Sequence, residues 1–206
     1  MTTDTFNDLN GVLLQGHIKI HDPESGEILI DKRNAIHYEN MSIALAESLG
    51  NAGQGPIYKM AFGNGGTSVD PTGIITYLTP NSTGTNASLY NQTFAKVVDD
   101  QASNNTDPVR NKIETRHVSG TNYTDILISC LLDYGEPSGQ DAFDTATNTE
   151  NLYVFDELGL ISSGASGTDG RLLTHVIFHP VQKSLNRLIQ IDYTVRVQSL
   201  TGFNEA

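Results

Sequence analysis

The histidines of this chain are the first residues whose type and spacing could support chemistry. His17 and His21 are four residues apart, and so are His175 and His179. Each pair lies in a stretch that favours a strand, where residues four apart share a face but are about 13 Å from each other. One metal ion could not join such a pair directly, although one histidine from each pair could still meet an aspartate or glutamate in space. The spacing therefore favours structural histidines, and we expect no metal site.

Two adjacent carboxylates, Asp156 and Glu157, are the next candidates. Neighbouring residues on a strand point to opposite faces, so the two groups would not meet as a catalytic pair. A more ordinary role is to cap backbone groups at a turn, or to pair with Arg171 or Arg187. The sequence therefore predicts a structural role for both carboxylates.

The glycine-rich segment Phe62–Thr67 has a composition that could cradle a phosphate. It lacks the Lys-Ser/Thr of a P-loop and the glycine spacing of a dinucleotide fingerprint. Ser68 follows, and the Val-Asp-Pro after it cannot easily begin a helix. A tight glycine turn and no bound cofactor are therefore predicted. We expect Gly63, Gly65 and, further along the chain, Gly159 to adopt backbone conformations that a side chain would strain.

Nucleophilic catalysis has little support in the sequence. A Gly-x-Ser-x-Gly elbow and a calcium-loop pattern are both absent. Cys130 stands alone in an apolar strand-like stretch, where a thiol stays protonated and behaves as a small hydrophobe. We therefore expect no catalytic residue and a protein that is not an enzyme, with a hydrolase as the disfavoured alternative.

The two strands that would organise the chain lie near its end. Residues 188–198 alternate strictly between apolar and polar side chains, which is typical of a strand with one buried face. Residues 171–178 are almost continuously apolar, as expected of a strand that is covered on both faces. The connection over residues 181–187 is short enough for antiparallel neighbours. Pro180 is expected to end or bulge the earlier strand.

The remaining elements are predominantly strands. An N-terminal hairpin is predicted over residues 16–36, and a second hairpin over residues 112–134. Short strands are expected over residues 59–67 and 92–98. A single α-helix is predicted over about residues 40–49, with Asn40 as its N-cap and Gly50 as a left-handed stop.

Long polar loops complete the pattern, because charged residues make up only 17% of the chain and Asn, Thr, Ser and Gly are abundant. Residues 68–89 and 135–150 are expected to form such loops, and residues 1–11 a flexible or partner-ordered arm. The sequence therefore predicts a mainly β fold: one antiparallel β-sandwich-like domain over residues 1–206, with one helix and long loops.

The net charge of −12 argues against a nucleic-acid partner, because phosphate neutralisation needs clustered Lys and Arg. It also disfavours anionic membranes, and no apolar run is as long as a membrane-spanning helix requires. We therefore expect neither nucleic acid nor membrane among the partners.

Three features follow one another along the chain. They are a helix rich in Ala and Leu (41–49), the segment from Met60 to Gly66, and the segment Asp156–Leu160 followed by Gly170 and a long last strand. This series resembles tailed-bacteriophage structural proteins, in particular the N-terminal module of tail-collar fibre proteins. In that module a Gly-rich turn follows a short strand, and a Glu-(Ile/Leu)-Gly-Leu segment precedes an Asp-Gly turn and two strands. The matching residues here are Gly63, Asn64, Gly65, Gly66, Glu157, Leu158, Gly159, Leu160, Asp169 and Gly170.

The resemblance covers residues 40–198 and implies a virion component made in the host bacterial cytoplasm. Collar, neck, baseplate and fibre-attachment proteins are the implied positions, with capsid decoration as an alternative. Its partners would be copies of itself, in a symmetric oligomer, and other virion proteins. No fibre shaft follows the module, so we do not expect a complete adhesin.

Contact surfaces in such a subunit are expected at the N-terminal arm, at residues 71–89 and at residues 135–150. Arg33, Arg187 and Arg196 are the candidates for pairing with carboxylates across an interface, because Arg is enriched there. A carbohydrate-binding β-sandwich remains an alternative. It would use exposed tyrosines and loop carboxylates such as Asp141 and Asp144, although Trp, the commonest sugar platform, is absent.

Overall fold

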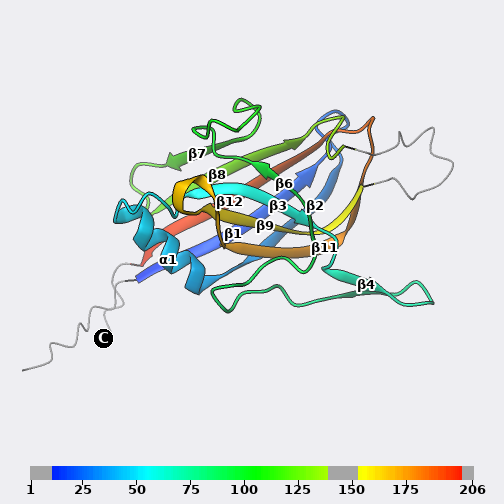
Figure 1. The fold of residues 1–206 in the computed structure, drawn as a ribbon, viewed down its shortest axis with the longest axis horizontal. Helices are drawn as coiled ribbons and strands as arrows, with labels where there is room; N and C mark the ends of the chain where they lie inside the picture. Colours follow the sequence, from blue (N-terminus) through cyan, green and yellow to red (C-terminus); the bar gives the residue numbers. More distant parts are fainter. Residues whose placement is uncertain (1–10, 139–152, 201–206) are drawn as a thin grey trace, which may run out of the picture.

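A computed structural model describes residues 11–138 and 153–200 of the chain. The prediction of a mainly β fold is confirmed: one long antiparallel sheet dominates the structure (Figure 1). Its strands lie in the order β6 (Gln92–Val97), β3 (Ile57–Gly63), β9 (Tyr153–Ser163), β11 (Thr174–Lys183), β2 (Ile28–Ile36), β1 (Gly11–His21), β12 (Ile189–Leu200), β8 (Tyr123–Leu132) and β7 (Lys112–His117). β10 (Asp169–Leu172) pairs separately with β9, after a 3-10 turn at Ala165–Gly167.

The sheet curls on itself, and one apolar core forms between its two halves. Phe62 on β3 and Leu160 on β9 belong to the same buried cluster as Cys130 on β8 and Ile191 on β12. The alternation predicted for the last strand is confirmed, since Ile189, Ile191, Tyr193 and Val195 are all buried. The fold is therefore β-sandwich-like, with the two layers supplied by one continuous sheet.

One predicted pairing is wrong: β11 and β12 are not neighbours. The N-terminal hairpin lies between them. β2 pairs with β11 at Ile36 and Ala35, and β1 pairs with β12 along the whole length of β1. The short connection after β11 turns a corner between the two halves of the sheet instead of closing a hairpin. Alternation along a strand reports which face is buried, but it does not report which strand lies alongside.

Both predicted hairpins agree with the structure, whereas the strand predicted over residues 171–178 is split between β10 and β11. β1 and β2 form the predicted hairpin, and so do β7 and β8. β11 shifts register between Ile177 and Val181, which places Pro180 in a bulge, as predicted.

The helix α1 (Tyr38–Leu49) confirms the predicted helix, but both of its ends differ from the prediction. The imidazole Nδ1 of His37 accepts the hydrogen bond from the Asn40 amide at 3.2 Å, so His37 is the N-cap. The Asn40 side chain is buried and donates to the carbonyl of Leu172 at 2.9 Å. Gly50 has a right-handed φ of −77°, and the left-handed residue is Asn51, with a φ of 51°.

The segment after β3 has more regular structure than expected. β4 (Thr67–Val69) and β5 (Ile75–Tyr77) form a separate two-stranded hairpin, here called the projecting hairpin (residues 67–78). It extends away from the body of the molecule, at the end opposite α1 (Figure 1). Of the loop predicted at residues 135–150, only the first four residues are described, and the predicted arm lies almost wholly outside the described residues.

Candidate functional site

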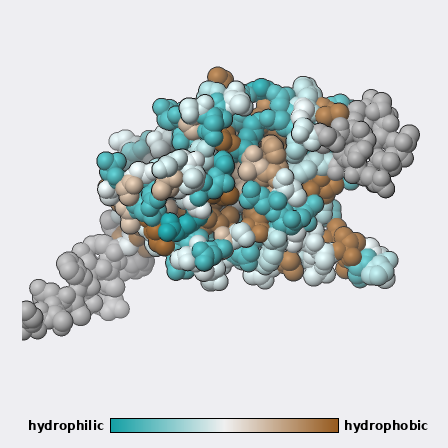
Figure 2. Space-filling model, viewed as in Figure 1, coloured by the Kyte–Doolittle hydropathy of each residue, from teal (hydrophilic) through white to brown (hydrophobic). Residues whose placement is uncertain are grey.

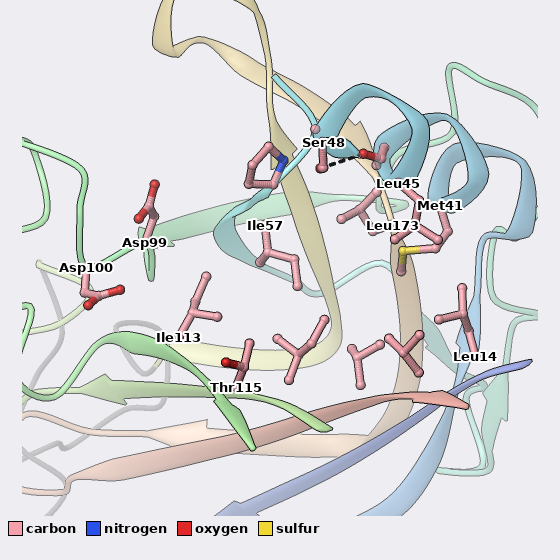
Figure 3. A pocket seen from close by; sticks show the side chains of 16 residues that line it. Leu14, Met41, Leu45, Ser48, Ile57, Asp99, Asp100, Ile113, Thr115 and Leu173 are labelled. Carbon is pink, nitrogen blue, oxygen red and sulfur yellow. Dashed lines mark hydrogen bonds between the residues drawn. The ribbon is translucent and has the colours of Figure 1, made fainter. Parts of the chain in front are cut away.

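An apolar groove lies between α1 and the facing half of the sheet (Figure 3). Its volume is about 400 Å³. Met41, Ala44 and Leu45 form the helical wall, and Val195 and Val197 lie on the strand that faces them. The other lining residues are Leu14, Ser48, Gly55, Pro56, Ile57, Asp99, Asp100, Ile113, Thr115, Ile126 and Leu173.

The same patterns that build the fold also build this groove. The apolar stripe of α1 faces the sheet, and β12 turns alternate side chains towards it. Ile113 on β7 and Ile126 on β8 also line the groove and remain partly exposed. The result is an apolar surface that is open to solvent, of the kind that marks binding or interaction sites.

Two carboxylates, Asp99 and Asp100, lie at one end of the groove, and Leu14 lies at the other (Figure 3). Asp99 accepts a hydrogen bond from the Gln101 amide at 2.9 Å, and Asp100 accepts one from the Gln101 side chain at 3.1 Å. Within the described residues, neither carboxylate forms an ion pair with Lys or Arg. This end of the groove therefore carries uncompensated negative charge.

The carboxylate of Glu157 is fully buried and accepts four hydrogen bonds. Three come from backbone amides, those of Gly65 (3.0 Å), Tyr90 (2.9 Å) and Asn91 (2.8 Å), and the fourth comes from Nε2 of His175 (3.0 Å). The other imidazole nitrogen, Nδ1, accepts from the Asn81 amide at 2.8 Å, so His175 is the neutral Nε2–H tautomer. Burial raises the pKa of Glu157, but the His175 and backbone hydrogen bonds outweigh it and hold that pKa below its usual value.

Asp156 completes this arrangement by accepting from the amides of Gly66 and Thr67, each at 2.9 Å. β3 ends at Gly63, opposite Glu157, and the glycine turn that follows donates its amides to both adjacent carboxylates. The prediction that they cap backbone groups is confirmed. The alternative pairing is wrong, because Arg171 binds Glu47, and Arg187 binds Asp22 and Glu27. The carboxylate oxygens of Asp156 and Glu157 therefore hold the segment between β3 and β6 against the sheet.

The three predicted turn glycines are required for a different reason from the one expected. Gly63, Gly65 and Gly159 all lack a positive φ. A Cβ on Gly159 would lie 2.6 Å from both the Thr174 carbonyl and Leu172. A Cβ on Gly63 would lie 2.5 Å from Glu157, and one on Gly65 would lie 2.8 Å from the Asn91 amide. Close approach of neighbouring groups, and not backbone conformation, excludes a side chain at these positions.

Two of the three candidate interface arginines already have partners within the chain. Arg196 forms two hydrogen bonds with Asp125, at 2.7 and 2.9 Å, and stacks 3.8 Å from the Tyr123 ring centroid. Arg187 joins the β1–β2 turn through Asp22 at 3.2 Å. Arg33 is exposed on β2. A contact with another subunit stays a prediction for all three.

The histidines are dispersed over the sheet. His17 contacts Asp31 at 2.8 Å and His21 contacts Asp192 at 2.9 Å, and these are separate pairs. In the part of the chain that the structure describes, no group of three His, Cys, Asp or Glu residues is arranged to hold a metal ion. Cys130 is buried, and burial raises the pKa of its thiol to about 12, in agreement with the inert role predicted for it.

The projecting hairpin exposes apolar side chains. The exposed fractions are 62% for Val69, 63% for Ile74, 50% for Tyr77 and 40% for Leu78. Hydrophobic residues gather over this hairpin in the space-filling view (Figure 2). Apolar side chains concentrated on an extension indicate a contact surface that one chain does not cover.

Sequence reasoning did not identify the groove, the role of His37 as the N-cap of α1, or the burial of Lys183. The groove is lined by six separate elements and their connections, so no local motif could reveal it. Lys183 follows the bulge in β11, where the alternation that marks buried positions is interrupted. His37 directly precedes the observed helix, which begins before the predicted start at Asn40, and histidine is not among the residues that commonly cap helices.

Comparison with known proteins found no matching family model, curated protein or solved structure. Among the helices within residues 11–138 and 153–200, none has the length and hydropathy needed to span a membrane.

Proposed function

We propose that this chain is a non-enzymatic structural subunit of a bacteriophage particle that assembles with copies of itself and with other virion proteins. The collar, neck, baseplate and fibre-attachment positions fit the motif resemblance, and capsid decoration is an alternative position. The observation that carries the proposal is the uncovered apolar surface at both ends of the molecule, in the groove and on the projecting hairpin. The polar groups that would be the first candidates for catalysis, Asp156, Glu157 and His175, are engaged in holding loops.

Two kinds of experiment test this function. Sedimentation and negative-stain imaging of the purified chain report its oligomeric state, and mass spectrometry of purified phage particles reports whether the chain is a virion component. We expect a symmetric oligomer and a virion-associated protein. A chain that stays monomeric across its accessible concentrations and is absent from purified particles would contradict the proposal.

A carbohydrate-binding module is the second candidate, and one observation favours it. The exposed Tyr38 lines the same depression beside β1 and β2 as Arg33 and Asn34. An aromatic ring next to hydrogen-bonding groups is suited to a sugar, although Asp141 and Asp144 lie outside the described residues. Specific retention on a glycan array that Tyr38→Ala abolishes would favour this function over assembly.

A further inference from the structure

We infer that the projecting hairpin of one copy docks in the apolar groove of the next copy. This inference rests on the proposed self-assembly and names the surfaces that carry it. Both surfaces are apolar and uncovered in a single chain, and both are removed from water by one contact.

The hairpin is anchored firmly enough to act as a docking element. Its base is bound to β9, because the Thr67 amide donates to Asp156 at 2.9 Å. The Leu78 amide closes its other end by donating to the Gly66 carbonyl at 2.9 Å. At its tip, Asp70 accepts from the amides of Thr72 (2.8 Å) and Ile74 (3.0 Å). A preorganised hairpin loses little conformational entropy when it binds.

The position of the two surfaces determines the kind of contact. The hairpin extends from the end of the molecule opposite α1, which forms one wall of the groove (Figures 1 and 3). A chain therefore cannot fill its own groove with its own hairpin. A contact between two different surfaces is heterologous, so repeated copies form a closed ring or an open filament.

The size of the contact favours a ring over an isolated pair. Burying four half-exposed apolar side chains removes on the order of 400 Å² from the hairpin. The groove exposes less surface than the hairpin, so the total is well below the ~1,200 Å² of a stable pair. In a closed ring every subunit makes the contact twice, and the second contact forms at a high effective concentration.

Charge limits which partner the groove accepts and gives the contact a distinct salt dependence. Asp70 is the only charged residue between Thr67 and Leu89, so the hairpin is nearly neutral in a chain of net charge −12. It approaches the end of the groove that carries Asp99 and Asp100 against a weak like-charge repulsion. Added salt screens that repulsion, so we expect self-association to strengthen with salt. A cationic partner in the groove would instead dissociate as salt rises.

Disulfide trapping tests the contact, because the native Cys130 is buried and does not interfere. The variant carrying both Ile74→Cys and Ser48→Cys places one thiol on the hairpin and one on the groove. Under mild oxidation we expect a ladder of dimers, trimers and higher species. A mixture of the two single variants should stop at dimers. The matched control replaces Ser48→Cys with Ser42→Cys, on the same helix but outside the groove, and should give no ladder.

Other outcomes would overturn the inference in distinguishable ways. Efficient dimers of Ile74→Cys alone would show a hairpin-to-hairpin contact. A link from Phe6→Cys to Ser48→Cys would assign the groove to the N-terminal segment. An oligomer that forms without the 74–48 link would refute the docking contact and leave the proposed function standing. A chain that never assembles would refute both.

A second variant measures the strength of the contact without disturbing the body of the protein. Val69→Ser combined with Ile74→Ser removes two exposed apolar side chains and should leave thermal unfolding nearly unchanged. We expect the association constant from sedimentation to fall about tenfold or more. An unchanged constant would show that the hairpin does not contribute to assembly.

Discussion

Glu157 joins two loops to one strand, since its four donors come from the glycine turn, from residues 90–91 and from β11. In Glu157→Gln the amide NH₂ would face amide donors that have no other acceptor. An unsatisfied buried donor costs about 1–3 kcal/mol, so we expect the free energy of unfolding in urea to fall by roughly 2–4 kcal/mol. Glu114→Gln changes an exposed carboxylate and should alter stability by less than about 0.5 kcal/mol.

The same carboxylate gives a pH dependence. The pKa of Glu157 is lower in the folded chain than its usual 4.5, so the unfolded chain binds the proton first on acidification. Its contribution is fully present above that value and is lost as the pH falls through the lower folded pKa. We expect Glu157→Gln to show a shallower loss of stability below about pH 4. A slope equal to that of the parent chain would contradict this role.

Lys183 gives a pH dependence in the alkaline range. Its ammonium is fully buried and donates to the Ser184 carbonyl at 2.8 Å. Burial lowers its pKa from 10.5 to about 8, although Glu136 and Asp133 act to raise it. Between these values the unfolded chain binds more protons at this lysine, so we expect Lys183 to contribute a rise in the free energy of unfolding from pH 8 towards pH 10. Buried Cys130 and Tyr153, whose pKa values are raised, contribute in the opposite sense.

Lys183→Met should remove that rise and increase stability at pH 7 by about 1–3 kcal/mol. Chemical denaturation at a series of pH values measures both effects. The matched control is Lys112→Met, which replaces a far more exposed lysine and should keep the rise. A variant that retains the parent's pH profile would show that another group titrates.

At the scale of elements, Gly159 sets how closely β9 approaches the chain from β10 to β11. A methyl group there would lie 2.6 Å from the Thr174 carbonyl. Backbone cannot yield as a flexible side chain does, so Gly159→Ala should lower the free energy of unfolding by about 1–3 kcal/mol. Gly135→Ala is the control: nothing lies within 4 Å of its Cβ position and its φ is not positive. It should be neutral or slightly stabilising. Equal effects would contradict the steric account.

Element identities were predictable from the sequence because they depend on local patterns. The alternation of Ile189, Ile191 and Tyr193 specifies an extended strand with one buried face, and the structure has it. Which strands become neighbours in the sheet is not specified by such local patterns. The insertion of β1 and β2 between β11 and β12 places Gly11 opposite Leu200, and nothing near either residue signals that pairing.

The site was less predictable than the fold for the same reason. Asp156 and Glu157 could be assigned a capping role from their neighbours, but Tyr90 and Asn91 became hydrogen-bond partners of Glu157 only through the fold. The groove needs α1, β12 and β7 to be assembled before it exists. The role of a side chain could thus be predicted where it depended on its own strand, and could not be predicted where it depended on the topology of the sheet.

At the scale of the whole molecule, the pairing of β1 with β12 brings both ends of the described chain to one edge of the structure. Gly11 and Leu200 are opposite each other, about 5 Å apart as strand partners are. Residues 201–206 followed by residues 1–10 could span that distance as a linker. A circular permutant opened between Ser25 and Gly26, in the exposed turn of the β1–β2 hairpin, should therefore fold.

The permutant tests whether the sheet depends on strand pairing or on chain order. We expect the far-ultraviolet circular dichroism of the parent and a modest decrease in melting temperature, because every buried pair of strands is retained. A permutant opened between Tyr193 and Thr194 provides the contrast. That break lies inside β12, which pairs with β1 on one side and β8 on the other, and it interrupts a buried strand. It should not fold cooperatively, and cooperative unfolding of both permutants with equal midpoints would show that β12 is not the strand on which the sheet depends.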